Sequence, residues 1–260
     1  MISRMFFLAL NTARELFRGK LLYSVLFLGA FLVAVVSIFG SASVGDQAEV
    51  VKDFGLFAIS MQSVLFLVLS GSGFLAKEIN KRTIWTTLSR AVSRTEFMLG
   101  KFFGMLAVSL VLIFFSCLLL TAYLYLLKGG LDLSVAISSY FIFLEATLVA
   151  AIVTLTSSFL VTPMLVGIIS FSLFLAGRSS EYLSYLVSEG LVKGLLKKVI
   201  EIAYWTLPRF SDLNISELAV KGQAELITLP FVTEATLYTL GYSLFLLAIS
   251  AFLFSRREFP

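Results

Sequence analysis

Long stretches without a single charged residue dominate this sequence and limit what it can fold into. Five of them occupy residues 21–45, 54–76, 102–127, 146–177 and 235–255. Each is near or above the length of about 18 apolar residues that marks a bilayer-spanning helix. The sequence does not show the alternation over about 10 residues that marks a strand of a membrane β-barrel. The pattern therefore predicts a single all-α, polytopic membrane domain over residues 1–260.

The composition agrees with a membrane protein and argues against several classes of function. The chain is 59% hydrophobic and 14% charged, whereas soluble domains are about 45–50% apolar. It contains no histidine, the commonest acid–base catalyst and a common metal ligand. Cys117 is the only cysteine, so no internal disulfide is available. We therefore expect a chain that is not an enzyme and that has no metal, no cofactor and no nucleic-acid partner of its own.

The apolar stretches divide into six expected spans, because one of them is too long for a single helix. Residues 134–177 would form a helix of roughly 66 Å, and the hydrocarbon core is about 30 Å thick. Thr162-Pro163 is the natural break, since proline opens or ends a helix. The expected spans are about 21–42, 54–76, 102–127, 134–160, a fifth from about 162, and 234–255.

The distribution of lysine and arginine orients these spans. If the N-terminus is cytoplasmic, twelve basic residues fall in inner segments, and the short outer loops hold only Lys52 and Lys128. Cytoplasmic loops normally carry this excess of positive charge. We therefore expect both termini in the cytoplasm.

Two segments outside the spans have an amphipathic pattern. Residues 2–18 place Phe6 and Leu10 on one helical face and Arg14 on the other, which predicts an interfacial helix that is either an anchor or an elbow for a docked partner. Residues 178–230 form one large segment expected outside the cytoplasm, amphipathic from Glu181 to about Ala203. We expect it to lie along the outer interface or to re-enter partway, either as a lid or as a contact for an envelope protein.

The segment 77–101 carries six basic residues in one short connection. Within it, Ile84, Trp85 and Leu88 form a small apolar face. Ser93-Arg-Thr-Glu96 is a capping box, in which each end residue bonds the backbone amide of the other. We therefore expect a short helix near 81–89, a break, and a new helix after Ser93.

Glu145 is the one charged residue expected deep in the membrane. It lies about 16 Å along its helix from Ser134. An ionised carboxylate at that depth costs about 2.5–3.5 kcal/mol on insertion scales, so it should face protein or water. Ser60 and Gln62 are its candidate neighbours. The site is either a structural hydrogen bond or part of a translocation pathway. A separate pair, Gly100 and Gly104, predicts close helix packing.

The stretch LAKEINKRTIWTTLSRAVSRTEFMLGKFFG, residues 75–104, resembles the cytoplasmic loop of type-2 exporter permeases of the ABC transporter superfamily. Glu78, Val92-Ser-Arg94 and Leu99-Gly-Lys101 stand where that family has an acidic residue, a VSR segment and an LGK motif. Arg82 replaces a usual glycine and Ala91 a frequent proline. The segments 207–214 and 254–259 also look like this family.

The resemblance implies a permease that pairs with a second copy or a homologue and sits on two ATP-binding subunits. The helix near 81–90 would then be a coupling helix, in the cytoplasmic membrane of a bacterium or archaeon. The implied docking residues are Arg14, Arg82, Ile84, Trp85, Leu88, Arg90, Arg94 and Glu96. The chain has no G-x-x-x-x-G-K-[ST] motif, so ATP and magnesium would bind the partner.

Two other functions are compatible with the sequence. An ion-coupled transporter would use Glu145, although such proteins usually carry several intramembrane ionisable groups. A membrane scaffold subunit would move nothing. A membrane-embedded enzyme is disfavoured, because no carboxylates or histidines converge at one interface.

Overall fold

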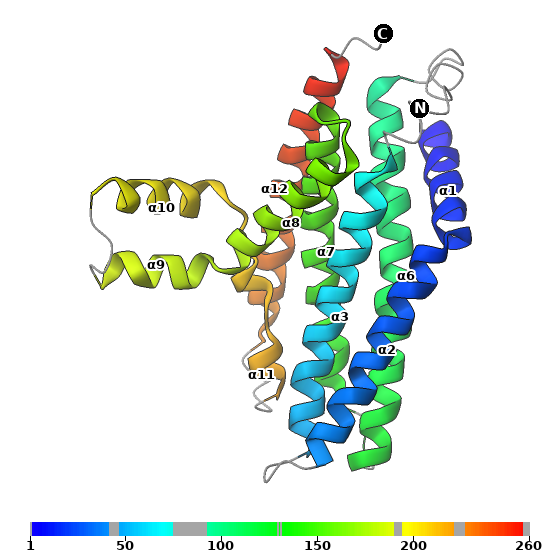
Figure 1. Cartoon of the computed structure of the whole chain (residues 1–260), viewed down its shortest axis with the longest axis vertical. Coiled ribbons are helices and arrows are strands. Elements are labelled where there is room, and N and C mark those ends of the chain that lie inside the picture. Colours follow the sequence, from blue (N-terminus) through cyan, green and yellow to red (C-terminus); the bar gives the residue numbers. More distant parts are fainter. Residues whose placement is uncertain are drawn as a thin grey trace.

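The computed structural model describes residues 2–41, 47–74, 93–128, 130, 132–189, 194–220 and 227–256 (Figure 1). In these ranges the chain is helical and has no strand. The elements are α1 (Ile2–Arg18), α2 (Lys20–Ser41), α3 (Gln47–Ser72), α6 (Arg94–Lys128), α7 (Leu133–Phe159), α8 (Pro163–Arg178), α9 (Ser180–Ser188), α10 (Leu195–Thr206), η1 (Ser211–Leu213), α11 (Ser216–Val220) and α12 (Leu229–Ser255).

Five of these helices, α2, α3, α6, α7 and α12, are long and apolar enough to cross a membrane. The bent pair α8 and α9 would make a sixth span if the two count as one. The structure therefore supports an all-α, membrane-embedded protein. Helix α3 begins at Gln47, earlier than the expected start near residue 54, and α6 begins at Arg94, directly after Ser93 as predicted.

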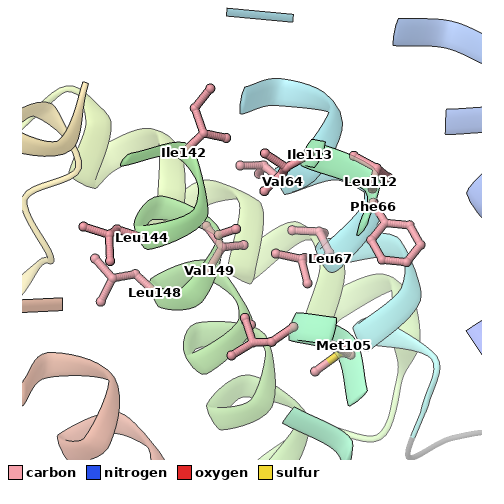
Figure 2. Packing of buried hydrophobic residues seen from close by; sticks show 14 of the residues in the cluster. Val64, Phe66, Leu67, Met105, Leu112, Ile113, Ile142, Leu144, Leu148 and Val149 are labelled. Carbon is pink, nitrogen blue, oxygen red and sulfur yellow. The ribbon is translucent and has the colours of Figure 1, made fainter. Parts of the chain in front are cut away.

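The core forms where α3, α6 and α7 pack together. Figure 2 shows apolar side chains from these three helices interlocking, among them Val64 and Leu67 of α3, Met105 of α6 and Val149 of α7. The most apolar windows of α3 and α7 are mostly buried, whereas those of α2 and α12 are buried over a third or less. The last two therefore form the outer layer and present much of their surface to the surroundings.

The predicted break at Thr162-Pro163 is confirmed. The amide of Leu160 donates to the carbonyl of Thr156 as the last bond of α7, and Pro163 opens α8. Hydroxyl groups near the end of α7 donate to backbone carbonyls of their own helix. Thr154 Oγ1, for example, donates to the Ala150 carbonyl at 2.7 Å.

Both the beginning of α1 and the end of α12 lie at one end of the bundle, here called the N/C end (Figure 1). There α1 packs along the first turns of α6, and the expected close packing at Gly100 and Gly104 is found. A Cβ atom on Gly100 would lie 2.6 Å from Leu8 Cβ, and one on Gly104 would lie 2.6 Å from Thr12 Cβ. The glycines therefore let α1 approach α6 closely.

The segment after α8 differs from the expectation of one amphipathic stretch. At Arg178 the chain bends by 54° into α9, and α9 and α10 project sideways from the bundle (Figure 1). Gly194, directly before α10, has φ +70°, a conformation that side-chain-bearing residues rarely adopt. The segment therefore starts at the side of the bundle rather than at its end.

Candidate functional site

A polar cluster lies at the centre of the bundle and joins α3, α7 and α8. Ser60 Oγ donates to Glu145 Oε2 at 2.7 Å, and Arg178 Nη1 donates to Glu145 Oε1 at 2.5 Å. The same Nη1 lies 3.1 Å from Ser60 Oγ, which accepts from it. Both carboxylate oxygens of Glu145 therefore have a partner, and Glu145 is only 4% exposed.

The cluster lies at the midpoint of two candidate spans. Ser60 lies about 20 Å from the start of α3, and Glu145 about 18 Å from the start of α7, at about 1.5 Å per residue. The expectation that Glu145 faces protein is confirmed, because a serine and an arginine surround it. The cluster is neutral as a whole when Arg178 and Glu145 are both ionised, which is how a buried charge is usually tolerated.

Aromatic rings frame the guanidinium of Arg178. Its Cζ lies 5.9 Å from the ring centroid of Phe57 and 5.8 Å from that of Phe174. Phe174 is fully buried and packs edge-on against Phe210 at 5.1 Å. Gly177 makes this possible, since a Cβ there would lie 2.4 Å from the Pro208 carbonyl oxygen. The 207–210 loop thus holds the end of α8 in place.

The sequence pattern does not predict Arg178 as a site residue. It assigns Arg178 to the segment 178–230 expected outside the cytoplasm, whereas the structure brings the side chain beside the middle of α3 and α7. A signal for it exists, because Arg178 is the first charge after Glu145 and follows Pro163 by about 22 Å of helix. That length falls short of a full crossing of about 30 Å.

Gln62 does not join this cluster. Residues two apart on a helix point about 200° apart, so Ser60 and Gln62 face opposite sides of α3. Gln62 Oε1 accepts from Ser116 Oγ of α6 at 3.2 Å, and its amide packs against Gly29 of α2. Its Nε2 has no hydrogen-bond partner among the described residues. These residues belong to a cavity of about 480 Å³ between α2, α3 and α6.

The predicted capping box is confirmed at the start of α6, at the N/C end. The amide of Ser93 donates to Glu96 Oε2 at 2.9 Å, and the amide of Glu96 donates to Ser93 Oγ at 3.1 Å. Arg94 Nη1 donates to the carbonyls of Phe254 and Ser255, both at 3.1 Å. The first turn of α6 is thereby fixed to the end of α12.

Of the six other implied docking residues, the structure describes only Arg14. Arg14 is exposed on α1, which packs along the first turns of α6. Its neighbour Glu15 lies 3.9 Å from Lys101 Nζ. Five others, and the expected short helix, lie outside the described residues: Arg82, Ile84, Trp85, Leu88 and Arg90.

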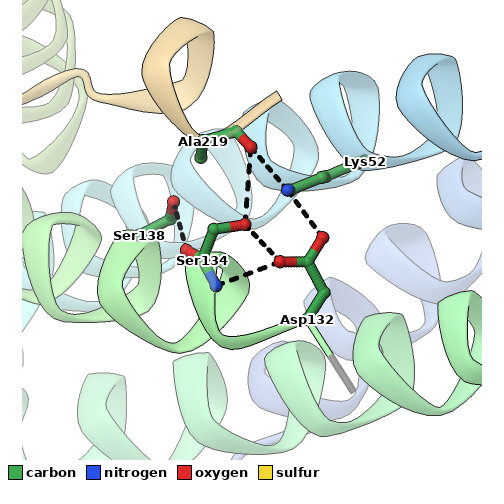
Figure 3. A network of polar contacts seen from close by, with 5 residues as sticks. All are labelled: Lys52, Asp132, Ser134, Ser138 and Ala219. Atoms are coloured by element: carbon green, nitrogen blue, oxygen red, sulfur yellow. Dashed lines mark hydrogen bonds and ion pairs between the residues drawn. The ribbon is translucent and has the colours of Figure 1, made fainter. Parts of the chain in front are cut away.

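Another polar site joins the starts of α3 and α7, at the end of the bundle opposite the N/C end (Figure 1). Figure 3 shows its contacts. Lys52 Nζ donates to Asp132 Oδ2 at 2.7 Å and to the Ala219 carbonyl of α11. Asp132 also caps α7 by accepting from the amide of Ser134 at 3.1 Å. Burial raises the pKa of Asp132, but the hydrogen bonds from Lys52 and Ser134 outweigh it and leave the pKa below its ordinary value. Lys52 was expected in a short outer loop, whereas the structure places it in α3, where it and Asp132 hold α11 against α3 and α7.

Over the ranges that the structure describes, no three His, Cys, Asp or Glu residues form a group that could hold a metal ion. No protein-family model matches the chain, and no curated protein matches it either. The contacts described above and the resemblance of residues 75–104 to a coupling loop are therefore what point to a function.

Proposed function

We propose that this chain is the permease subunit of an ATP-driven ABC exporter, with six spans and both termini in the cytoplasm. In this proposal two permease chains, identical or homologous, form the pathway on two separate ATP-binding subunits, and lipid or another amphipathic molecule is the cargo. The protein would reside in the cytoplasmic membrane of a bacterium or archaeon.

The observation that carries the proposal is the set of contacts made by the first turns of α6, residues 93–104. The capping box places the start of α6 directly after the basic segment whose sequence resembles a coupling loop. Arg94 bonds the end of α12, and Gly100 and Gly104 lie against α1. A subunit bound to residues 77–92 would therefore act on α6 and, through its contacts, on α12 and α1.

The test is co-purification. We expect tagged protein from native membranes, extracted in mild detergent, to bring an ATP-binding subunit with vanadate-sensitive ATPase activity. The double variant Trp85→Ala, Arg90→Glu should insert normally and lose that partner. A matched control is Trp205→Ala, Lys198→Glu, which makes the same chemical changes on exposed residues of α10. Equal retention of the partner by both variants would rule out the docking assignment.

The Glu145–Arg178 pair favours a second candidate, an ion-coupled carrier. A carboxylate paired with an arginine at mid-span is a common element of proton and ion pathways. Transport in reconstituted vesicles separates the two candidates. A carrier would respond to an ion gradient with no ATP present, whereas an exporter would need ATP and the partner subunit. Retained ATPase activity without any transport would instead indicate a scaffold.

A further inference from the structure

Arg178 has hydrogen-bonding capacity that the protein does not use. A guanidinium carries five N–H donors. In the structure only Nη1 donates, to Glu145 and Ser60. Nε and Nη2 make no hydrogen bond to any described residue, and they are not among the buried polar atoms left without a partner. Their donors therefore reach the molecular surface, in agreement with the 16% exposure of the side chain.

The depth of Arg178 makes this exposure informative. The residue lies beside the midpoints of α3 and α7, about 18–20 Å from the start of each. A guanidinium N–H directed at lipid hydrocarbon there would lack any partner, which membrane proteins avoid. The face of α3 and α8 around Arg178 must therefore meet water, a polar ligand or another protein.

The surroundings of Arg178 select the kind of ligand. Phe57, which is 48% exposed, lies beside the guanidinium and offers an apolar surface next to the free donors. The N–H groups at Nε and Nη2 of Arg178 would bind a ligand oxygen that accepts hydrogen bonds. Glu145 already neutralises Arg178 and is itself buried, so a ligand with a full negative charge would leave the site with an uncompensated charge. An uncharged acceptor, such as an ester carbonyl or a hydroxyl group, leaves it neutral.

We propose that Arg178 and Phe57 form a binding site for an uncharged amphipathic molecule that carries ester or hydroxyl oxygens. Arg178 donates to these oxygens through Nε and Nη2, and Phe57 packs against the chain. Glu145 and Ser60 act as positioning residues, because they hold the guanidinium without touching the ligand. This inference rests on the proposed transport function only for the fate of the ligand; binding itself needs neither ATP nor the partner subunit.

The experiment uses the full chain in lipid nanodiscs and three photoreactive probes of matched chain length. One is a monoacylglycerol, one a free fatty acid, and one a hydrocarbon without oxygen. We expect the monoacylglycerol to label peptides of α3 and α8, and unlabelled monoacylglycerol to compete. The hydrocarbon should label all exposed helices evenly. The double variant Glu145→Gln, Arg178→Gln should reduce specific labelling by about tenfold or more, as expected for lost hydrogen bonds from a charged donor.

A milder pair of variants keeps the test valid if the double variant does not fold. Phe57→Ala should reduce labelling about two- to fivefold, because the ring beside the donors is lost. Phe115→Ala, on a residue of α6 that is 53% exposed, is the matched control and should leave it unchanged.

Three results would overturn the inference. Preferred labelling by the fatty acid would mean that the site binds anions. Equal effects of the two phenylalanine variants would mean general lipid contact. Crosslinking between two chains from a photoreactive residue at position 57, without lipid labelling, would mean that a second copy covers the face. None of these depends on an ATPase partner, so the permease assignment is tested independently.

Discussion

Lys52 Nζ and Asp132 Oδ2 lie 2.7 Å apart and join the starts of α3 and α7 across the end of the bundle. Lys52 is almost fully buried, at 5% exposure, so the ion pair with Asp132 offsets part of the cost of taking its ammonium group out of water. Asp132→Asn keeps a good capping residue for α7 but removes the negative charge. We expect a loss of about 1–3 kcal/mol in stability, measured by thermal unfolding in detergent. A variant as stable as the wild type would mean that water solvates Lys52.

The same pair predicts how stability depends on pH. The pKa of Asp132 is lowered in the folded protein, so its contribution is complete above the unfolded pKa of about 3.9 and is lost as the pH falls through the folded value. Between about pH 5 and pH 2 the wild type should therefore lose more stability than Asp132→Asn. Melting temperatures of both proteins across this range measure the difference. Parallel curves would contradict the role assigned to Asp132.

Ser93 should set the start of α6. Ser93→Ala removes the hydroxyl that accepts from the amide of Glu96, and loss of such a cap costs about 1 kcal/mol. We expect faster amide hydrogen exchange over the first turn of α6. Under the proposed function, the variant should also hold the ATP-binding subunit less tightly. Glu96→Gln is the control, since glutamine also completes a capping box.

Gly104 should be the most sensitive contact between α1 and α6. A Cβ at this position would lie 2.8 Å from the backbone oxygen of Ala9 and 2.6 Å from Thr12 Cβ. Gly104→Ala should therefore cost about 1–3 kcal/mol through overpacking. Gly241→Ala is the matched control on α12, where a Cβ meets nothing within 4 Å, and the better helix propensity of alanine should leave it equal or more stable. Thermal unfolding of the two variants measures whether only Gly104→Ala lowers the stability.

Features set by local chemistry could be predicted from the sequence. The break before Pro163, the Ser93–Glu96 capping box and the Gly100–Gly104 contact each follow from a few neighbouring residues. The partners of Glu145 could be predicted only in part. Ser60 was found, but Gln62 faces away because it lies two positions further along α3.

Features that depend on where a helix stops could not be predicted in the same way. Arg178 reaches Glu145 because α8 ends at this residue, halfway through the bundle, where the 207–210 loop packs closely against Gly177. The sequence predicts Lys52 as a loop charge, because it does not show that α11 folds back over this residue. Such contacts join residues far apart in the chain, and no periodic pattern marks them.

The ion pair of Glu145 and Arg178 can be measured with a double-mutant cycle. Removing either partner alone leaves the other charge buried, and such changes cost about 3–5 kcal/mol. Glu145→Gln and Arg178→Gln should therefore each destabilise the protein strongly. The double variant should be more stable than the sum of the two effects predicts, since no unpaired charge is left. Thermal unfolding of the wild type and the three variants in lipid nanodiscs gives the coupling energy. Additive effects would show that the two side chains act independently, and both the central cluster and the ligand site built on it would then have to be abandoned.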